Sequence, residues 1–289
     1  MEVIQRFESA ALYFTLASYL LATLFNWADV FKKSALFKKF SLALTMFGLI
    51  GNTILLALRI VVKFNDSGLV IEQYKFLNTY EFLLAFTWFT VLLTLLLIQR
   101  DQVKVCGTFI MPIILVLFVY VLLVEAGTTT DLSRFPIFRS NWLTGYMLTS
   151  ALSYSAFAIS FGLGIMYLLK DYLNKTNPRG TFTQYLPGLD ALDQLGYRFV
   201  SHGFPFFTIS IVLGAIWANN AWGRFWSWEP KETWSFISWL AYIAYLHARL
   251  LYGWRGNRSA WMAVMGFLAV LFTFIGVNYF LPGQTIFIR

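Results

Sequence analysis

Apolar segments of about 20 residues recur along this chain, and they constrain its fold more than any other feature. A helix of about that length spans the roughly 30 Å hydrocarbon layer of a bilayer. The chain is therefore predicted to be an all-α, polytopic membrane helix bundle, with one integral membrane domain over residues 1–289. About eight spans are predicted, at 9–28, 41–62, 82–99, 107–125, 143–170, 199–219, 233–252 and 258–281.

Composition agrees with a membrane protein and excludes several other classes. Charged residues make up 12% of the chain, about half the fraction in a soluble globular domain, and apolar residues make up 58%. The single cysteine, Cys106, excludes an internal disulfide and a thiolate metal cluster. The net charge of +8 favours contact with anionic membrane lipid and not with nucleic acid.

The distribution of positive charge predicts the orientation of the chain. Lys and Arg are more frequent in the odd-numbered loops between spans than in the even-numbered loops. Loops rich in these residues stay on the cytoplasmic side, so both termini and the sixth loop are predicted to face outward. The fifth loop, 171–198, is the longest polar connection, and its segment 189–195 is predicted to form an amphipathic helix at the cytoplasmic interface.

The sixth loop reads WGRFWSWEPKETW over residues 222–234. Tryptophan collects at membrane interfaces as an anchor, which explains each indole taken singly. The whole stretch indicates more, because Gly223 and Pro230 break the helix and allow the rings to form a platform. Haem would suit this platform, with Arg224 or Lys231 contacting a propionate, and a quinone or a lipid would suit it nearly as well. The candidate residues of this site are Trp217, Trp222, Arg224, Trp226, Trp228, Glu229, Lys231 and Trp234.

The chain has two histidines, His202 in the sixth predicted span and His247 in the seventh. An ionisable side chain inside a membrane helix is a candidate functional residue, although a hydrogen bond to a neighbouring helix would explain it equally well. The helical rise places His202 about 25 Å from Asn219 and His247 about 21 Å from Thr233. Both imidazoles are therefore predicted to lie at similar depth, toward the cytoplasmic side, where a pair could ligate one haem iron. The depth of each histidine in the membrane does not determine whether the two imidazoles face each other.

The tryptophan-rich stretch resembles the WWD signature of the haem-handling cytochrome c assembly family. The most similar branch is the CcsA/ResC type of the system II cytochrome c synthase. The resemblance is strongest over residues 197–278, which are predicted to form the haem-handling region. Its further matches are YR at 197–198, GFP at 203–205, YLH at 245–247 and GVN at 276–278.

The resemblance implies a function, a cofactor and partners. The histidine of the YLH element, His247, would ligate haem b within the membrane. The chain would present haem at the outer face for thioether attachment to apocytochrome c, as a component of a holocytochrome c synthase. A ResB-type membrane partner with an outer domain is implied. The location would be a bacterial plasma membrane or a thylakoid membrane, with the tryptophan loop on the outer or lumenal side.

The sequence departs from the family pattern at several positions. The family has two outer histidines that hold haem, where this chain has Tyr146 and the stretch 281–285. It also has Asp at the position of Glu229, and it typically lacks a histidine at the position of His202. These differences leave open an alternative, a diverged non-catalytic paralogue that acts as a scaffold or docking subunit without haem ligation. A third hypothesis is export of free haem or porphyrin, powered by a partner.

Overall fold

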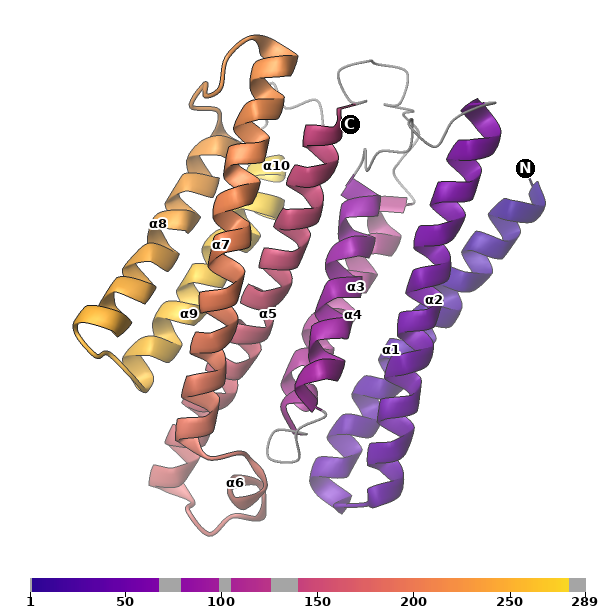
Figure 1. The fold of residues 1–289 in the computed structure, drawn as a ribbon. Coiled ribbons are helices and arrows are strands. Elements are labelled where there is room, and N and C mark those ends of the chain that lie inside the picture. The colour runs from indigo at the N-terminus through magenta and orange to yellow at the C-terminus, as the bar shows by residue number, and fades with distance from the viewer. Residues whose placement is uncertain (1, 68–78, 99–104, 126–139, 281–289) are drawn as a thin grey trace.

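The computed structural model describes residues 2–67, 79–98, 105–125 and 140–280 (Figure 1). All regular secondary structure within these ranges is helical, which confirms the predicted fold class. The helices in chain order are α1 (Glu2–Lys32), α2 (Ala35–Ser67), α3 (Thr79–Ile98), α4 (Gly107–Glu125), α5 (Asn141–Thr176), α6 (Thr181–Tyr185), α7 (Leu189–Trp222), α8 (Pro230–Leu251), α9 (Asn257–Leu271), the π-helix η5 (Phe272–Gly276) and α10 (Val277–Phe280).

Among the described residues, seven helical segments are long and apolar enough to cross a membrane. They coincide with seven of the eight predicted spans. The remaining predicted span, 233–252, corresponds to α8, whose 22 residues would also reach across a bilayer. Its composition differs, because polar and amphipathic side chains such as His247 and Arg249 lower its mean hydropathy. The seven segments are Arg6–Lys32, Ala35–Arg59, Thr79–Ile98, Gly107–Val124, Asn141–Thr176, Leu189–Trp222 and Asn257–Gly276.

The helices are arranged roughly in the order of the chain (Figure 1). The α1–α2 hairpin lies on one side, α3 and α4 lie next to it, and α8 and α9 lie on the other side. Between them, α5 and α7 make the most extensive contact of any pair of helices in the described part of the chain. The connection from α7 to α8 lies at the same end of the bundle as the start of α1, and α6 lies at the opposite end.

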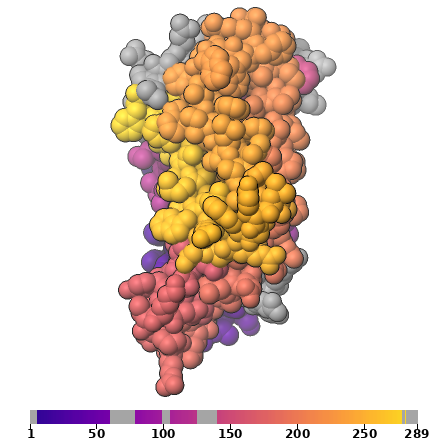
Figure 2. All heavy atoms as spheres, turned by 90° about the vertical axis from the view of Figure 1, so that its left-hand side faces the viewer, coloured from indigo at the N-terminus to yellow at the C-terminus, as the bar shows by residue number. Residues whose placement is uncertain are grey.

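Two helices are much longer than a bilayer requires. With 36 and 34 residues, α5 and α7 extend about 54 Å and about 51 Å. Their ends therefore project past the α8–α9 turn, and Figure 2 shows the end of α5 with α6 protruding below that turn. Residues 189–195 are helical, as predicted, and they form the first two turns of α7, continuous with its membrane-length segment. Asp193 in this segment faces α8, where it pairs with Arg249 at 2.7 Å and does not face solvent.

Close contacts between α5, α7 and α8 fix the part of the bundle that carries the tryptophan-rich segment. Gly203 of α7 lies so near α5 that a Cβ atom there would come within 2.8 Å of the Cβ of Ala156. The ring of Phe157 on α5 stacks on that of Tyr242 of α8, with centroids 3.7 Å apart. These contacts leave little freedom for α7 and α8 to shift relative to α5.

Candidate functional site

The tryptophan-rich segment is a short loop between two helices. Helix α7 ends at Trp222, and Gly223 follows in the left-handed conformation with φ of 71°, which favours glycine at a helix C-terminus. Helix α8 then begins at Pro230, three residues before the predicted span 233–252. A proline is well suited to the first turn of a helix because its missing N–H has no partner to lose there.

A carboxylate in the first turn of α8 holds this loop in place. Glu232 accepts a hydrogen bond from the backbone N–H of Ser227 at 2.7 Å and another from its hydroxyl. Trp228 has a φ of 58°, which a residue with a Cβ adopts only at a cost of about 1 kcal/mol or more. Its carbonyl accepts a hydrogen bond from the hydroxyl of Thr233 at 3.2 Å. The loop is thus anchored to α8 by side chains of its own sequence.

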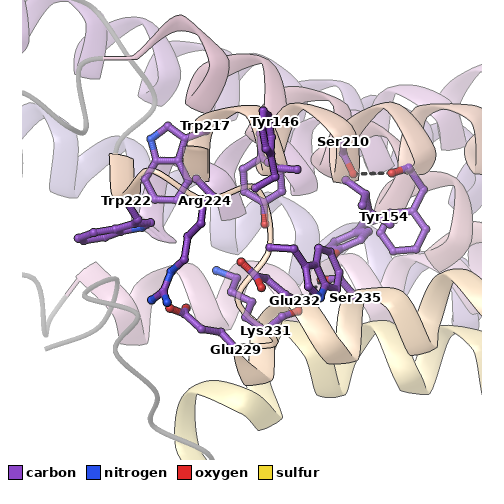
Figure 3. A pocket seen from close by; sticks show the side chains of 17 residues that line it. Tyr146, Tyr154, Ser210, Trp217, Trp222, Arg224, Glu229, Lys231, Glu232 and Ser235 are labelled. Carbon is purple, nitrogen blue, oxygen red and sulfur yellow. Dashed lines mark hydrogen bonds between the residues drawn. The ribbon is translucent and has the colours of Figure 1, made fainter. Parts of the chain in front are cut away.

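A cavity of about 430 Å³ lies beside this loop, with walls from α5, α7, the loop and α8 (Figure 3). That volume is within the range of small-molecule sites in proteins. Six of the ten predicted site residues line it: Trp217, Trp222, Arg224, Trp226, Glu229 and Lys231.

The cavity combines aromatic walls with a charged edge. Figure 3 shows the guanidinium of Arg224 pointing toward the carboxylate of Glu229, while Lys231 extends toward Glu232. Lys231 lies in the first turn of α8, outside the predicted span 233–252, and burial lowers the pKa of its ammonium to about 8. The edge therefore combines two basic and two acidic side chains, and the basic groups could bind an anionic group of a ligand.

Two other predicted tryptophans lie outside this cavity. Trp228 is 69% exposed and lines a separate apolar groove of about 380 Å³ on the surface of α7 and α8. Trp226 lines both the groove and the cavity, and its ring meets that of Trp228 edge-on at 5.7 Å. Trp234 packs against Phe272 of η5, with ring centroids 4.2 Å apart. In this structure Trp234 therefore contributes to the packing of α8 on η5.

The two histidines lie on different surfaces of the bundle. Phe204 and Thr208 of α7 both contact Trp239 of α8. With about 100° of turn per residue, His202 points about 140° away from the face that these two residues define. His202 instead lines a groove formed by α3, α5 and α7, whereas His247 is exposed on α8. The structure therefore does not bring the predicted pair of imidazoles together.

His247 has an aromatic neighbour close to the end of its helix. Its ring lies 5.6 Å from that of Tyr252, the residue that follows α8. The buried side chains of α8 are on another face and include Ser238, Tyr242 and Tyr245. His247 is thus exposed on the surface of α8, and His202 is exposed in its groove on α7.

The structure adds two tyrosines of α5 that were not among the predicted site residues. Tyr146 and Tyr154 both line the cavity. Tyr146 can approach α7 closely because Gly214 faces it, and a Cβ at that glycine would lie 3.2 Å from its ring. Tyr146 could have been named from the sequence, because it stands where the resemblance implies an outer histidine. The second such position, 281–285, lies outside the described residues.

A buried polar network at the opposite end of α7 was also missed. Arg249 makes a two-pronged ion pair with Asp193 and also donates to the hydroxyl of Ser259 at 3.1 Å. Its guanidinium lies 4.6 Å from the ring centre of Tyr197. The backbone N–H of Gly256 donates to the same aspartate at 3.0 Å. An arginine inside an apolar helix requires a counter-charge, so Arg249 could have indicated from the sequence that an acidic partner lies nearby.

Metal ligands are sparse throughout the described residues. They contain no cluster of three His, Cys, Asp or Glu side chains that could hold a metal ion. Within the cavity, the side chains suited to an iron atom are the hydroxyls of Tyr146 and Tyr154. The aromatic walls of the cavity could contact the flat face of a ligand, and its basic side chains could contact anionic groups.

Comparisons with known proteins agree with the sequence signature. The family described as "Cytochrome C assembly protein" matches residues 76–284. The "Cytochrome c biogenesis protein CcsA" of Guillardia theta is 35% identical over 248 residues, covering 79% of this chain and 81% of that protein. The protein with the same description from Chlamydomonas reinhardtii is 37% identical over 238 residues, covering 78% of this chain and 63% of that protein.

A solved structure shares the fold. It is described as "Cytochrome c Heme Lyase CcmF" and matches with a TM-score of 0.67 at 17% identity. The match covers 92% of this chain and 46% of the other, so this chain spans about half the length of that protein. At this identity the likeness concerns the fold alone. Together with the match over residues 76–284 and the membrane-length helices, these findings show that the chain is an integral membrane protein of the cytochrome c assembly protein family.

Proposed function

We propose that this chain binds haem b in the cavity beside the tryptophan-rich loop and presents it to apocytochrome c during cytochrome c maturation. The observation that carries this proposal is the convergence of six predicted site residues on one cavity of about 430 Å³. Three of these residues are tryptophans, and two are basic. Family membership supplies the class of reaction, and the cavity supplies a place for the cargo.

The side chains of the cavity fit the macrocycle and its propionates. Trp217, Trp222 and Trp226 can contact the porphyrin faces and edges, and Arg224 and Lys231 can each bind a carboxylate. Haem supplies vinyl groups, to which two cysteine thiols of the apocytochrome add as thioethers. The residues of this chain orient the ring, exclude water and neutralise the propionates. The iron would take an axial imidazole from elsewhere, because neither described histidine lines this cavity.

A partner protein is the natural source of that ligand. We infer a ResB-type membrane partner whose outer domain covers the tryptophan-rich loop. The loop would lie on the outer or lumenal side of a bacterial plasma membrane or a thylakoid membrane. The exposed rings of Trp222 and Trp228, at 47% and 69%, offer contact surface for such a domain. In this proposal residues 1–289 act as one integral membrane domain.

Haem titration of the purified chain in detergent tests the proposal. Trp222→Ala removes an aromatic wall and Arg224→Gln removes a cation, so each should weaken haem binding by about tenfold, equivalent to about 1.4 kcal/mol. Trp261→Ala is the matched control, since Trp261 is a similarly exposed indole, at 56%, on α9 away from the cavity. Equal affinities for the wild type and both cavity variants would refute the proposal.

The absence of a described histidine from the cavity favours one competing function. In that function the chain is a scaffold that uses its aromatic loop to dock a partner, without binding haem. It predicts that Trp228→Ala disrupts a membrane complex on native gels while Trp222→Ala and Arg224→Gln leave haem content unchanged. Loss of haem in the latter two variants, with the complex intact, would exclude the scaffold function.

A further inference from the structure

The groove that His202 lines, between α3, α5 and α7, has no role in the proposed function. Its volume is about 330 Å³. Both α3 and α7 pack against α5, whereas in the described part of the chain they make little contact with each other. The groove therefore runs between α3 and α7, with α5 as its floor. Small residues keep this floor low, because Ala156 of α5 lies against Gly203 of α7.

Apolar side chains form the walls of the groove, and some of them are exposed. Leu96 of α3 is 53% exposed and Phe206 of α7 is 39% exposed. Both residues belong to membrane-length helices, so in a bilayer this surface contacts hydrocarbon chains and not water. The walls therefore fit the hydrocarbon part of a lipid. The other apolar wall residues are Leu93, Leu97, Leu152, Leu195 and Phe199.

The length of the groove matches the depth of one membrane leaflet. Along α7 it extends from Leu195 to Phe206. This is a rise of about 16 Å, close to half of the roughly 30 Å hydrocarbon layer. On the facing wall, Leu97 is next to the last residue of α3, a helix whose 20 residues are about as long as this layer is thick. The groove thus runs from the membrane boundary at the α6 end toward the middle of the membrane.

Arg198 supplies a cation at the boundary end of the groove. Its side chain is exposed and lines the groove. Two other arginines on membrane-length or neighbouring helices have acidic partners, because Arg59 pairs with Glu8 and Arg249 pairs with Asp193, each at 2.7 Å. Within the described ranges, no acidic side chain forms an ion pair with Arg198. A basic side chain in this position attracts the phosphate of an anionic lipid.

His202 marks the lower limit of the polar part of the groove. Its Nδ1 donates a hydrogen bond to the backbone carbonyl oxygen of Arg198, at 2.6 Å. It lies one turn deeper than Arg198, about 6 Å along the helix, which is close to the thickness of the headgroup layer. Beyond His202 the groove is lined by Gly203 and Phe206 of α7. From the boundary inward, the groove therefore changes from cationic to polar to apolar.

We propose that this groove binds an anionic phospholipid of the leaflet at the α6 end, with its phosphate on Arg198 and one acyl chain between α3 and α7. The lipid matches the groove in charge, in the order of polar and apolar parts, and in the length of its chain. A lipid without net charge would use the walls but leave Arg198 without a counter-charge. The acyl chain fills the space between two helices that otherwise meet through α5, so the bound lipid should stabilise the bundle.

The experiment is native mass spectrometry of the purified full chain, incubated with phosphatidylglycerol or with phosphatidylcholine of the same acyl chains. The wild type should retain one phosphatidylglycerol in preference to phosphatidylcholine, and this lipid should raise its unfolding temperature more. Arg198→Gln should weaken phosphatidylglycerol binding by about fivefold and leave phosphatidylcholine binding unchanged. No haem is needed, so the result is independent of the proposed function.

Three further variants separate the headgroup from the chain. Arg255→Gln is the matched control, since Arg255 is an exposed arginine in the α8–α9 connection, outside the groove, and it should behave as the wild type. Leu96→Trp enlarges an exposed side chain of the wall and should reduce retention of both lipids. His202→Gln keeps a polar side chain of similar size and should retain phosphatidylglycerol. Unfolding in detergent without added lipid checks that each variant folds.

Several outcomes would overturn the inference. One is equal binding of the two lipids by the wild type, or an equal loss of phosphatidylglycerol in Arg198→Gln and Arg255→Gln. Another is unchanged retention in Leu96→Trp, which would place the lipid outside the groove. Loss in His202→Gln as large as that in Arg198→Gln would assign the occupant to the imidazole. A dimer that Leu96→Trp dissociates, with no dependence on lipid, would identify the occupant as a second copy of the chain.

Discussion

Single side chains give the tryptophan-rich loop its shape and its charge. Glu232 accepts two hydrogen bonds from Ser227, so one carboxylate both starts α8 and anchors the loop that precedes it. Acidic residues are favoured in the first turn of a helix because the N–H groups there point outward. Lys231 lies beside Glu232 in the same turn, and both side chains line the cavity. Glu232 thus serves both the fold of the loop and the edge of the cavity.

The lowered pKa of Lys231 predicts a pH dependence of ligand binding. With its pKa at about 8, the ammonium is charged at pH 7 and loses its proton as the pH rises through 8. Propionates stay ionised over that range, so affinity for haem should fall several-fold between pH 7 and pH 9. Lys231→Arg keeps its charge and should show a flat profile. Parallel pH profiles for the two proteins would contradict the assignment of Lys231 as a propionate partner.

At the scale of helices, α7 is the element on which the site depends. It contributes residues to the cavity beside the tryptophan-rich loop, to the groove that His202 lines and to the buried network at Asp193. Its position is fixed by α5 at one flank and by α8 and α9 at the other. Substitutions that disturb the packing of α7 should therefore affect all three of these sites.

Gly203 and Gly196 form a matched pair on α7. A Cβ at Gly203 would lie 2.8 Å from Ala156 and 3.1 Å from the ring of Phe157, so Gly203→Ala forces α5 and α7 apart. We expect a loss of stability of about 1–3 kcal/mol. A Cβ at Gly196 meets only the hydroxyl of Ser160 at 3.7 Å, so Gly196→Ala should be neutral or slightly stabilising. Unfolding in detergent measures both, and equal effects would argue against close α5–α7 packing at Gly203.

The Asp193–Arg249 ion pair should stabilise the junction of α7, α8 and α9. Their side chains are 9% and 8% exposed, so Asp193→Asn leaves a buried guanidinium without its counter-charge. The expected loss is about 3 kcal/mol. Replacing both partners, as Asp193→Asn with Arg249→Met, should restore part of it. Lys175→Ala, which breaks a pair whose lysine is 66% exposed, should change stability by well under 1 kcal/mol.

At the scale of the molecule, the two ends of the bundle differ in character. One end carries the tryptophan-rich loop and its cavity, and the other carries α6 and the projecting ends of α5 and α7 (Figures 1 and 2). The odd-numbered loops hold more Lys and Arg than the even-numbered loops, and the α1–α2 turn and α6 lie at the same end of the bundle. The charge rule therefore predicts that this end faces the cytoplasm.

Cysteine labelling tests this orientation. Cys106 is fully buried, so it should stay unlabelled and need not be replaced. Phe225→Cys, in the loop where Phe225 is 58% exposed, should react with a membrane-impermeant maleimide in intact cells. Gln184→Cys, on the exposed side of α6, should react only after permeabilisation. The opposite pattern would reverse the predicted orientation and place the tryptophan loop in the cytoplasm.

The sequence by itself determined the fold class and six of the residues that line the cavity beside the tryptophan-rich loop. Runs of apolar residues have to form helices in a bilayer, because unpaired backbone groups are too costly there. The signature at 222–234 is local in the chain, so its residues could be named in advance, and Trp222, Arg224 and Lys231 do share one cavity. Tertiary structure alone decided which faces of the helices meet. Depth along a helix follows from residue number, but rotation about its axis follows from packing, and for this reason His202 and His247 lie on separate surfaces. The same packing placed Tyr146 in the cavity and joined Asp193 to Arg249 across 56 residues of chain.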